Sequence, residues 1–413
     1  MQLPALSKPI YVLRRLSRQL WVRMALIAIL ALVAAASSTL LGRFVPASFA
    51  GRLSPEAVLR ILEILASSML AVTTFSLSVM VAARQWASSQ STPRAHRLVL
   101  EDNITQNALA TFLGAFIFAL TALILVSTEV QEGRDLVVIL GFTGLVIALV
   151  VIAILRWIDH LTNLGGVSET ADRIEDAARD ALRLFARHPL LGANPLTEDT
   201  PREGLEPVVA TETGYIRHLD PSELEACAKA ADTRVLVQVK VGDFVTEGDP
   251  LVLAGSSADR DALRSAFVIG RTRTFDQDPT FGIMVLSEIA QRALSPGTND
   301  PATAIEVIGR ILRLLIQVAD KTEDDPSVEY PNVFMPPLTL GMLCAEAFEA
   351  IARDGADKVE VQVTLQRALA RLTETGDADL AQAARSCSDR ALALADATDP
   401  LEEDRERMRA AAP

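Results

Sequence analysis

The chain has 413 residues, of which 50% are hydrophobic, and its formal net charge is −13. That length is enough for two or three domains. The charge is divided unevenly, because residues 1–159 hold 13 Lys and Arg against 8 Asp and Glu, whereas residues 160–413 hold 26 against 44. A basic, apolar first part and an acidic second part are typical of a membrane region joined to a soluble domain. The acidic part argues against nucleic acid as a partner, since phosphate binding needs clustered Lys and Arg.

Four stretches without a charged residue dominate the first part of the chain. A helix crosses the hydrocarbon core of a bilayer in about 20 residues, and each charge at its centre costs about 2.5–3.5 kcal/mol. The first stretch could belong to a signal peptide, but it exceeds the usual apolar length of about 7–15 residues and three more stretches follow it. We therefore predict a transmembrane domain of four helices over residues 1–158, with spans at about 24–42, 64–83, 105–128 and 136–155.

The distribution of basic residues predicts the orientation of these spans. Five basic residues and no acid precede the first span, and three arginines lie between the second and third spans. By the positive-inside rule, we expect the N-terminus, the middle loop and the C-terminal part to lie in the cytoplasm of a bacterium, with the spans in its inner membrane. Only two short loops, near Gly42–Pro55 and Thr128–Asp135, would then face outside, which argues against an extracellular receptor.

Polar side chains fall on one helical face in two of the predicted spans. They are Ser67, Thr74 and Ser78 in the second span, and Asn107 and Thr111 in the third. Small and hydroxyl-bearing residues let helices approach closely, so a helix-packing face is one interpretation. The other is a weakly polar path for an ion or solute. No Asp, Glu, Lys, Arg or His lies in the middle of a predicted span, which argues against a proton relay or a voltage sensor.

A small β module is predicted after the membrane domain. Residues 159–207 should form an amphipathic helix, which begins near Ser168, and then a linker. Residues 208–257 should form the β module, because valines alternate from Val235 to Val241 and glycine-containing turns follow them. A helix over residues 221–231 interrupts this module.

The β module resembles one half of a barrel-sandwich hybrid, the fold of biotinyl and lipoyl domains. Those carriers present a modified lysine at the tip of a hairpin. Here Lys240 lies inside a predicted strand, before the turn at Gly242-Asp243. A structural or oligomerising barrel is therefore favoured over a swinging-arm carrier.

Residues 258–413 are predicted to form an α-helical cytoplasmic domain. Two of its segments, Gly270–Pro279 and Arg292–Pro301, are rich in polar and turn-forming residues. In the second, Gly297 suits a left-handed turn, and Asp300 suits a helix cap followed by a proline at the first helical position.

Three interpretations of these two segments remain open. A capped corner between two helices needs no function. Alternatively, the helix N-terminus after Asp300, with Arg271 and Arg273 folded against it, forms an anion pocket. In the third, the same surface makes a subunit contact. The residues concerned are Arg271, Arg273, Asp278, Arg292, Ser295, Gly297, Asn299 and Asp300.

Motifs for catalysis and cofactor binding are missing from the sequence. It holds no GxxxxGK[ST], no GxGxxG after a strand, no HExxH and no GxSxG. The four histidines are never spaced as metal ligands, and the three cysteines form no CxxC pair, which fits a reducing compartment. We therefore expect no enzyme activity, no cofactor and no metal.

Several segments together resemble one protein family. They are Thr74-Phe75-Ser76, Ala87-Ser88-Ser89-Gln90 with Pro93-Arg94, Gly242-Asp243-Phe244-Val245 with Glu247-Gly248 and Pro250-Leu251, Gly270-Arg271 through Asp278-Pro279, and Arg292-Ala293-Leu294-Ser295-Pro296-Gly297 with Asn299-Asp300-Pro301. From the first span to about Arg371 the chain is similar to a family of predicted bacterial membrane proteins of unknown function (domain-of-unknown-function family 2254). Ser91-Thr92 departs from the family pattern, which tends to have an aromatic residue and then a small one. The resemblance implies this layout and brings no catalytic or binding residues with it.

Two functions from different classes remain as expectations. The first is a homo-oligomeric, channel-like protein in which the second and third spans line a path for an ion or solute. Its partners would be the lipid bilayer and further copies of the chain. The second is a membrane-anchored scaffold or regulatory protein, whose cytoplasmic part recruits a cytoplasmic protein and whose spans only pack.

Overall fold

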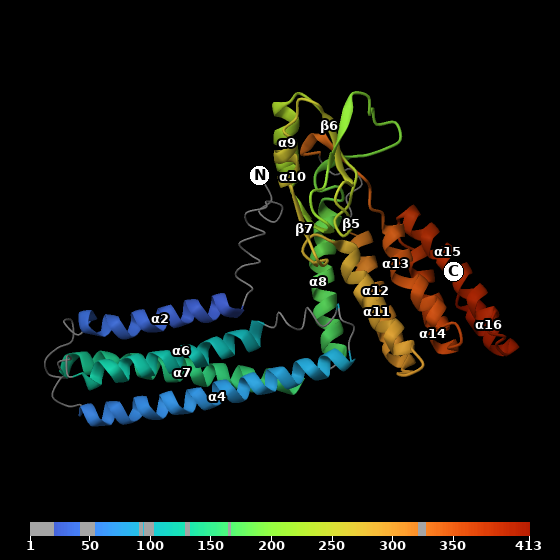
Figure 1. Ribbon diagram of the computed structural model, residues 1–413. Coiled ribbons are helices and arrows are strands. Elements are labelled where there is room, and N and C mark those ends of the chain that lie inside the picture. The colour runs from blue at the N-terminus through green and yellow to red at the C-terminus, as the bar shows by residue number, and fades with distance from the viewer. Residues whose placement is uncertain are drawn as a thin grey trace. The chain divides into compact units, whose positions relative to one another are not determined.

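The computed structural model describes residues 20–41, 54–90, 94, 103–128, 133–163, 167–320 and 328–413. Two compact units divide the described residues between Glu169 and Thr170. The first, called the membrane unit here, is entirely helical (Figure 1). The second, called the C-terminal unit, combines two small sheets with a set of helices. The protein is therefore mostly helical, with one mixed α/β region.

Four helices make up the described part of the membrane unit. They are α2 (Leu20–Leu41), α4 (Pro55–Gln90), α6 (Asn103–Ser127) and α7 (Gly133–Asn163). Three of them are long and apolar enough to cross a membrane, over Pro55–Ala82, Ile104–Ser127 and Asp135–Leu161. Among the described residues of α2, the apolar stretch is shorter and covers Met24–Ala34.

Helix α4 begins before the second predicted span. The sequence places it at 64–83, whereas α4 already begins at Pro55. Ser54 precedes the helix, and its hydroxyl accepts a hydrogen bond from the backbone N–H of Ala57 at 3.2 Å. A serine cap followed by proline at the first helical position is a strong start signal. A search for charge-free windows misses this start because Glu56, Arg60 and Glu63 lie in the first turns.

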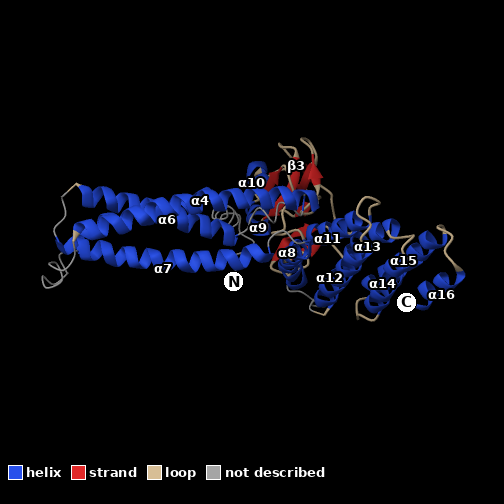
Figure 2. Cartoon of the chain, turned by 90° about the horizontal axis from the view of Figure 1, so that it is seen from below, coloured by secondary structure: helices blue, strands red, loops and turns tan. Residues whose placement is uncertain are grey.

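Helix α6 forms the centre of the membrane unit. It packs against α2, α4 and α7, and half of its apolar stretch is buried, against 17% for each of the two flanking spans. Figure 2 shows α6 between α4 and α7. Its buried face alternates small and large residues, among them Ala108, Phe112, Ala115 and Phe118. Small side chains on this face allow the neighbouring helices to lie close, as in other membrane bundles.

Eight strands form two sheets in the C-terminal unit, after α8 (Val167–Arg187). The first sheet has the order β1-β8-β4-β6-β2, and the second has the order β5-β3-β7. The strands are β1 (Ala193–Pro195), β2 (Leu205–Val209), β3 (Gly214–Leu219), β4 (Val235–Val237), β5 (Phe244–Val245), β6 (Pro250–Gly255), β7 (Phe267–Gly270) and β8 (Tyr330–Met335). Helices α9 (Pro221–Ala230) and α10 (Arg260–Ser265) lie between strands in the chain. The predicted helix at 221–231 therefore corresponds to α9.

The β region is larger than residues 208–257. Strands β1 and β2 begin inside the predicted linker, and β7 and β8 lie inside the predicted helical domain. Strand β8 pairs in parallel with both β1 and β4, so its partners lie far away in the sequence. Local alternation cannot reveal such a pairing. Buried residues such as Val333 hold β8 in the core that the sheets share.

The remaining helices complete the C-terminal unit. They are α11 (Pro279–Leu294), α12 (Pro301–Ala319), α13 (Leu340–Asp354), α14 (Val359–Thr373), α15 (Ala378–Asp396) and α16 (Glu402–Ala410). Helix α11 packs against α12 and α13, and α15 packs against α13 and α14. Side chains of Asp278, Asp300, Thr339 and Asp377 cap four of these helices.

Candidate functional site

The hydroxyl-bearing face of α4 points away from the rest of the membrane unit. Ser67, Thr74 and Ser78 are exposed, whereas Ser76 is fully buried. Ser67 and Ser76 are nine positions apart, which at about 100° per residue places them on opposite sides of the helix. The predicted face therefore exists, but it faces the surroundings of one copy and not its interior.

These exposed hydroxyls donate hydrogen bonds to backbone carbonyls of their own helix. Ser67 Oγ donates to the carbonyl of Glu63 at 2.9 Å, and Ser78 Oγ donates to the carbonyl of Thr74 at 3.0 Å. Thr74 Oγ1 donates to the carbonyl of Ala71 at 2.9 Å. Such hydrogen bonds within the helix pair the O–H donor, so the hydroxyl can lie in hydrocarbon. Its oxygen can still accept a hydrogen bond.

Glu63 lies one turn before Ser67 and is also exposed. Because α4 begins at Pro55, Glu63 is about 12 Å inside the helix and not at its edge. From the charge-free window, Glu63 lies at the edge of the second predicted span, and the structure places it further inside the helix. The exposed face of α4 thus joins one carboxylate to a row of hydroxyls.

Asn107 and Thr111 of α6 do not share a surface with the α4 hydroxyls. They line a cavity of about 560 Å³ between α2, α6 and α7. Thr111 Oγ1 donates to the carbonyl of Asn107 at 2.8 Å. Within one copy, the hydroxyls of α4 and the polar residues of α6 therefore lie on different surfaces.

The Thr74-Phe75-Ser76 segment is divided between two faces of α4. Thr74 and Phe75 are both exposed, and the Phe75 ring also makes an edge contact with Trp157 of α7, with ring centroids 6.4 Å apart. Phe112 of α6 contacts the same indole at 6.3 Å. Of the three residues, Ser76 lies in the core of the membrane unit, and Phe75 contacts α7 only at the edge of its ring.

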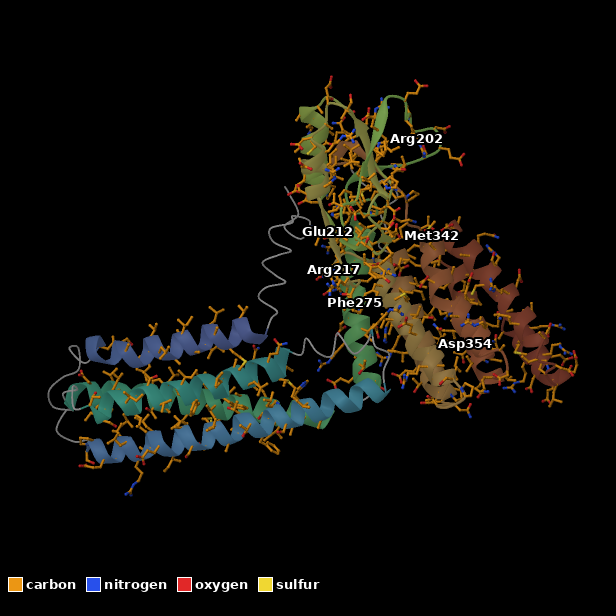
Figure 3. The ribbon with its side chains drawn as sticks, viewed as in Figure 1. Arg202, Glu212, Arg217, Phe275, Met342 and Asp354 are labelled. Carbon is orange, nitrogen blue, oxygen red and sulfur yellow. The ribbon has the colours of Figure 1, made fainter. Side chains whose placement is uncertain are left out.

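The segment from Gly270 to Pro279 is held against β3 and the start of α11. Arg217 of β3 donates from Nε to the carbonyl of Thr272 at 2.5 Å, and Gln277 bonds both backbone groups of Leu219. Figure 3 labels Arg217 and Phe275 at this junction. Phe275 packs on Phe281 of α11, with centroids 4.6 Å apart. The polar residues of this segment are thus mostly used to hold the loop.

Arg273 and Asp278 form an ion pair at the N-terminus of α11. Arg273 donates to both carboxylate oxygens of Asp278, at 2.8 and 2.9 Å, and its guanidinium lies 5.1 Å from the ring centroid of Phe281. Asp278 also accepts from the backbone N–H groups of Thr280 and Phe281, so it caps the helix. Its side chain is 1% exposed. Burial raises the pKa of Asp278, against the pull of the guanidinium.

Gly242, in the turn before β5, lies against this ion pair. Its φ is +98°, in the region that favours glycine. A Cβ at this position would lie 2.7 Å from Nη2 of Arg273 and closer still to the carboxylate of Asp278. Two of the family-like segments, at 242–251 and 270–279, therefore meet at one point in the structure.

The second polar segment forms the corner between α11 and α12. Asp300 caps α12, accepting from the backbone N–H of Thr303 at 3.1 Å, and Pro301 is the first helical residue. Both features match the sequence prediction. The left-handed position is Asn299, with φ +48°, and not Gly297. Asparagine tolerates this conformation better than most residues, so either position was compatible with the pattern.

The structure does not assemble the predicted anion pocket. Arg273 binds at the start of α11, whereas Asp300 lies just after the end of that 16-residue helix. A helix of this length spans about 24 Å, so Arg273 cannot fold against the start of α12. Arg271 is exposed, as are Arg292 and Gly297, while Ser295 donates to the carbonyl of Arg292. The eight predicted residues thus fall into two separate groups.

A cluster of charges between α8 and α12 was missed by the sequence analysis. Glu175 is 3% exposed and accepts hydrogen bonds from Arg310 at 3.0 Å and from Arg313 at 2.9 and 2.7 Å. Burial acts to raise the pKa of Glu175, but the arginines outweigh it and lower the pKa. Charged residues at helical spacing on both segments were the available signal, and they resemble an ordinary solvated face.

A family model and several related sequences match this chain. Residues 17–371 match the family model described as "Predicted membrane protein (DUF2254)". Uncharacterized proteins of Mycobacterium bovis and of two Mycobacterium tuberculosis strains are each 29% identical over 294 residues, covering 68% of this chain and 55% of theirs. The chain therefore spans about half the length of these curated relatives. No solved structure matches it. The match to the family model covers most of the chain, and the protein belongs to this family of predicted membrane proteins.

Proposed function

We propose that the protein is a homo-oligomeric, channel-like protein of the bacterial inner membrane, which passes an ion or small solute. The observation that carries this proposal is the outward face of α4. Ser67, Thr74 and Ser78 lie directly opposite the side that packs on α6. Polar residues on the outer face of a membrane helix can pack against another copy of the chain or line a path between copies. The path then lies between copies.

Two further features support an assembly of copies. Gly141 and Gly144 of α7 are exposed, and a Cβ at either would have no heavy atom within 4 Å. Glycines there are not needed for packing within one copy, and small residues are common where membrane helices meet. Glu63 at the end of the hydroxyl row would form a ring of carboxylates in such an assembly, which favours cations.

The proposal includes α2 as a fourth span and the orientation given by the basic residues. Helix α2 has 22 residues, so it is about 33 Å long, slightly more than the hydrocarbon core of about 30 Å. Four spans leave both ends of the chain on one side. The positive-inside rule assigns that side to the cytoplasm. The barrel-sandwich resemblance of the β region fits a role in holding copies together.

Flux through liposomes tests this proposal. Purified protein should pass a small cation, and Thr74→Val with Ser78→Val should lower the flux at least severalfold, because it removes two hydroxyl acceptors from the path. Thr143→Val is the matched control, since Thr143 of α7 is 1% exposed and bonds the carbonyl of Ile139. Absence of flux from the unaltered protein, or equal flux after the double change, would contradict the proposal.

The alternative, a membrane-anchored scaffold, has one specific observation in its favour. Phe244 and Met342 are 56% and 47% exposed in the C-terminal unit. Tyr215 contacts Phe244, with ring centroids 5.0 Å apart, and Lys240 reaches Met342 at 3.9 Å. Exposed aromatic and methionine side chains are typical of protein contact sites.

Point variants test the scaffold better than a deletion. Removing residues 259–413 would also remove β7 and β8, which belong to the two sheets. Phe244→Ser with Met342→Ser should abolish binding of cytoplasmic proteins that co-purify with the unaltered chain, without loss of thermal stability. Leu401→Ser is a control, because Leu401 is 75% exposed and lies elsewhere. If the same proteins still co-purify with the double variant, this patch does not recruit them.

A further inference from the structure

The cavity between α2, α6 and α7 has the form of a ligand site. Its volume of about 560 Å³ lies within the range of about 300–1,000 Å³ that small-molecule sites occupy. All three helices belong to the membrane unit, so its walls are positioned together. Gly114 of α6 allows α2 to close one wall, because an added Cβ there would collide with Ile27.

The walls of this cavity are suited to a hydrocarbon chain. Small and branched apolar residues dominate the lining, among them Ala31, Ala115, Val146 and Ala153. Thr111, one of the few polar lining residues, turns its hydroxyl proton to its own helix. The Thr111 hydroxyl therefore offers no proton to a ligand, and methylene groups can pack against it without leaving that donor unpaired.

One end of the cavity carries a positive charge. Helices α6 and α7 run in opposite directions, so Arg156 of α7 lies at the same end as Ile104 and Asn107 of α6. The opposite end is lined by apolar residues, including Phe118 and Phe142. Arg156 is exposed, and no ion pair or hydrogen bond joins its side chain to another described residue. Among the described residues, no side chain thus competes with a ligand for its guanidinium.

The length of the cavity matches a lipid chain that starts at the membrane surface. Lining residues of α7 extend from Phe142 to Arg156, or about 21 Å at 1.5 Å per residue. The hydrocarbon core of a bilayer is about 30 Å thick, so the cavity reaches from one surface past the middle. A guanidinium binds phosphate with two parallel hydrogen bonds, which makes a lipid phosphate the complementary group at its mouth.

From this geometry we infer that the cavity is a specific site for an anionic phospholipid. The phosphate binds Arg156, and one acyl chain lies along α6 and α7 toward Phe118. The lipid fills the space that the three helices leave and fixes their spacing. This site is separate from the α4 face, so it does not depend on the proposed channel.

Lipid retention by the purified full-length protein tests the inference. Native mass spectrometry after exchange into defined lipid should show phosphatidylglycerol retained about tenfold more than phosphatidylcholine with the same acyl chains, which corresponds to about 1.4 kcal/mol. Arg156→Gln should abolish this preference. Arg60→Gln should keep it, because Arg60 is an exposed arginine of α4 outside the cavity.

A second variant tests the acyl-chain part of the site. Ala153→Phe places a large side chain in the cavity and should lower retention of both lipids at this site, with unchanged elution of the protein in detergent. Equal retention of the two lipids by the unaltered protein would overturn the inference, because it indicates an ordinary lipid annulus. So would an equal loss in Arg60→Gln and Arg156→Gln, or full retention in Ala153→Phe.

Discussion

Two glycines of the β region have nearly the same backbone conformation and very different surroundings. Gly242 has φ +98° and Gly248 has φ +96°, but only Gly242 has neighbours that an added Cβ would strike. Gly248→Ala should cost about 1–2 kcal/mol, the penalty for a left-handed L-residue. Gly242→Ala should cost about 1–3 kcal/mol more, because it also displaces the buried pair of Arg273 and Asp278.

Thermal or chemical unfolding of the two alanine variants measures this difference. Equal losses would show that the contact between Gly242 and the ion pair does not contribute to stability. A larger loss in Gly248→Ala would contradict the placement of the turn. Adding Asp278→Asn to Gly242→Ala tests the coupling, since the two changes affect one contact and should not add.

At the scale of secondary-structure elements, Glu175 joins α8 to α12. Glu175→Gln leaves Arg310 and Arg313 without that carboxylate and should destabilise the C-terminal unit by about 1–3 kcal/mol near neutral pH. Asp180→Asn is the matched control on the same helix. Its partner Arg183 is 3.7 Å away and both side chains are more than half exposed, so the loss should be below about 1 kcal/mol.

The contribution of Glu175 to the stability of the fold should depend on pH. Because the folded-state pKa of Glu175 is lowered from its ordinary value of 4.5, its contribution is present above that value and is lost as the pH falls through the lowered pKa. The difference in stability between the unaltered protein and Glu175→Gln should therefore shrink between neutral pH and about pH 3. A difference that grows toward acid would contradict this assignment.

Elements with local signals were predictable from the sequence, and elements with distant partners were not. The start of α12 was predicted from Asp300-Pro301, since both the cap and the proline are local features, and Asp278-Pro279 carries the same signal at the start of α11. Strand β8 carries no comparable signal, because it is defined by parallel pairing with β1 and β4. The start of α4 at Pro55 had a local signal, but charges in its first turns concealed it.

The candidate site shows the same limit. Helical periodicity correctly grouped Ser67, Thr74 and Ser78 on one face of α4, but it could not say whether that face points inward or outward. Nor could it show that Asn107 and Thr111 line a cavity on the other side of α6. In the C-terminal unit, Arg273 and Asp300 are close in sequence, yet α11 separates them. Orientation and partner choice depend on tertiary packing, which one sequence reports only indirectly.

At the scale of the whole molecule, the outer face of α4 is the proposed contact between copies. The membrane unit buries α6 and leaves α4 and α7 largely exposed over their apolar lengths. Exposed apolar side chains on α4, such as Leu70 and Leu77, are compatible with lipid, whereas the hydroxyl row beside them is better suited to a neighbouring copy. Assembly is therefore the property on which the proposed path depends.

Cysteine cross-linking in native membranes measures this contact most directly. Thr74→Cys and Ser78→Cys should form covalent dimers on mild oxidation, whereas Met69→Cys, on the buried face of α4, should not. The parent chain sets the background, because Cys227, Cys344 and Cys387 all lie in the C-terminal unit. A contact between copies through this face of α4 should give dimers at Thr74 and Ser78 alone. No dimer at either position, or dimers from Met69→Cys at the same yield, would contradict it.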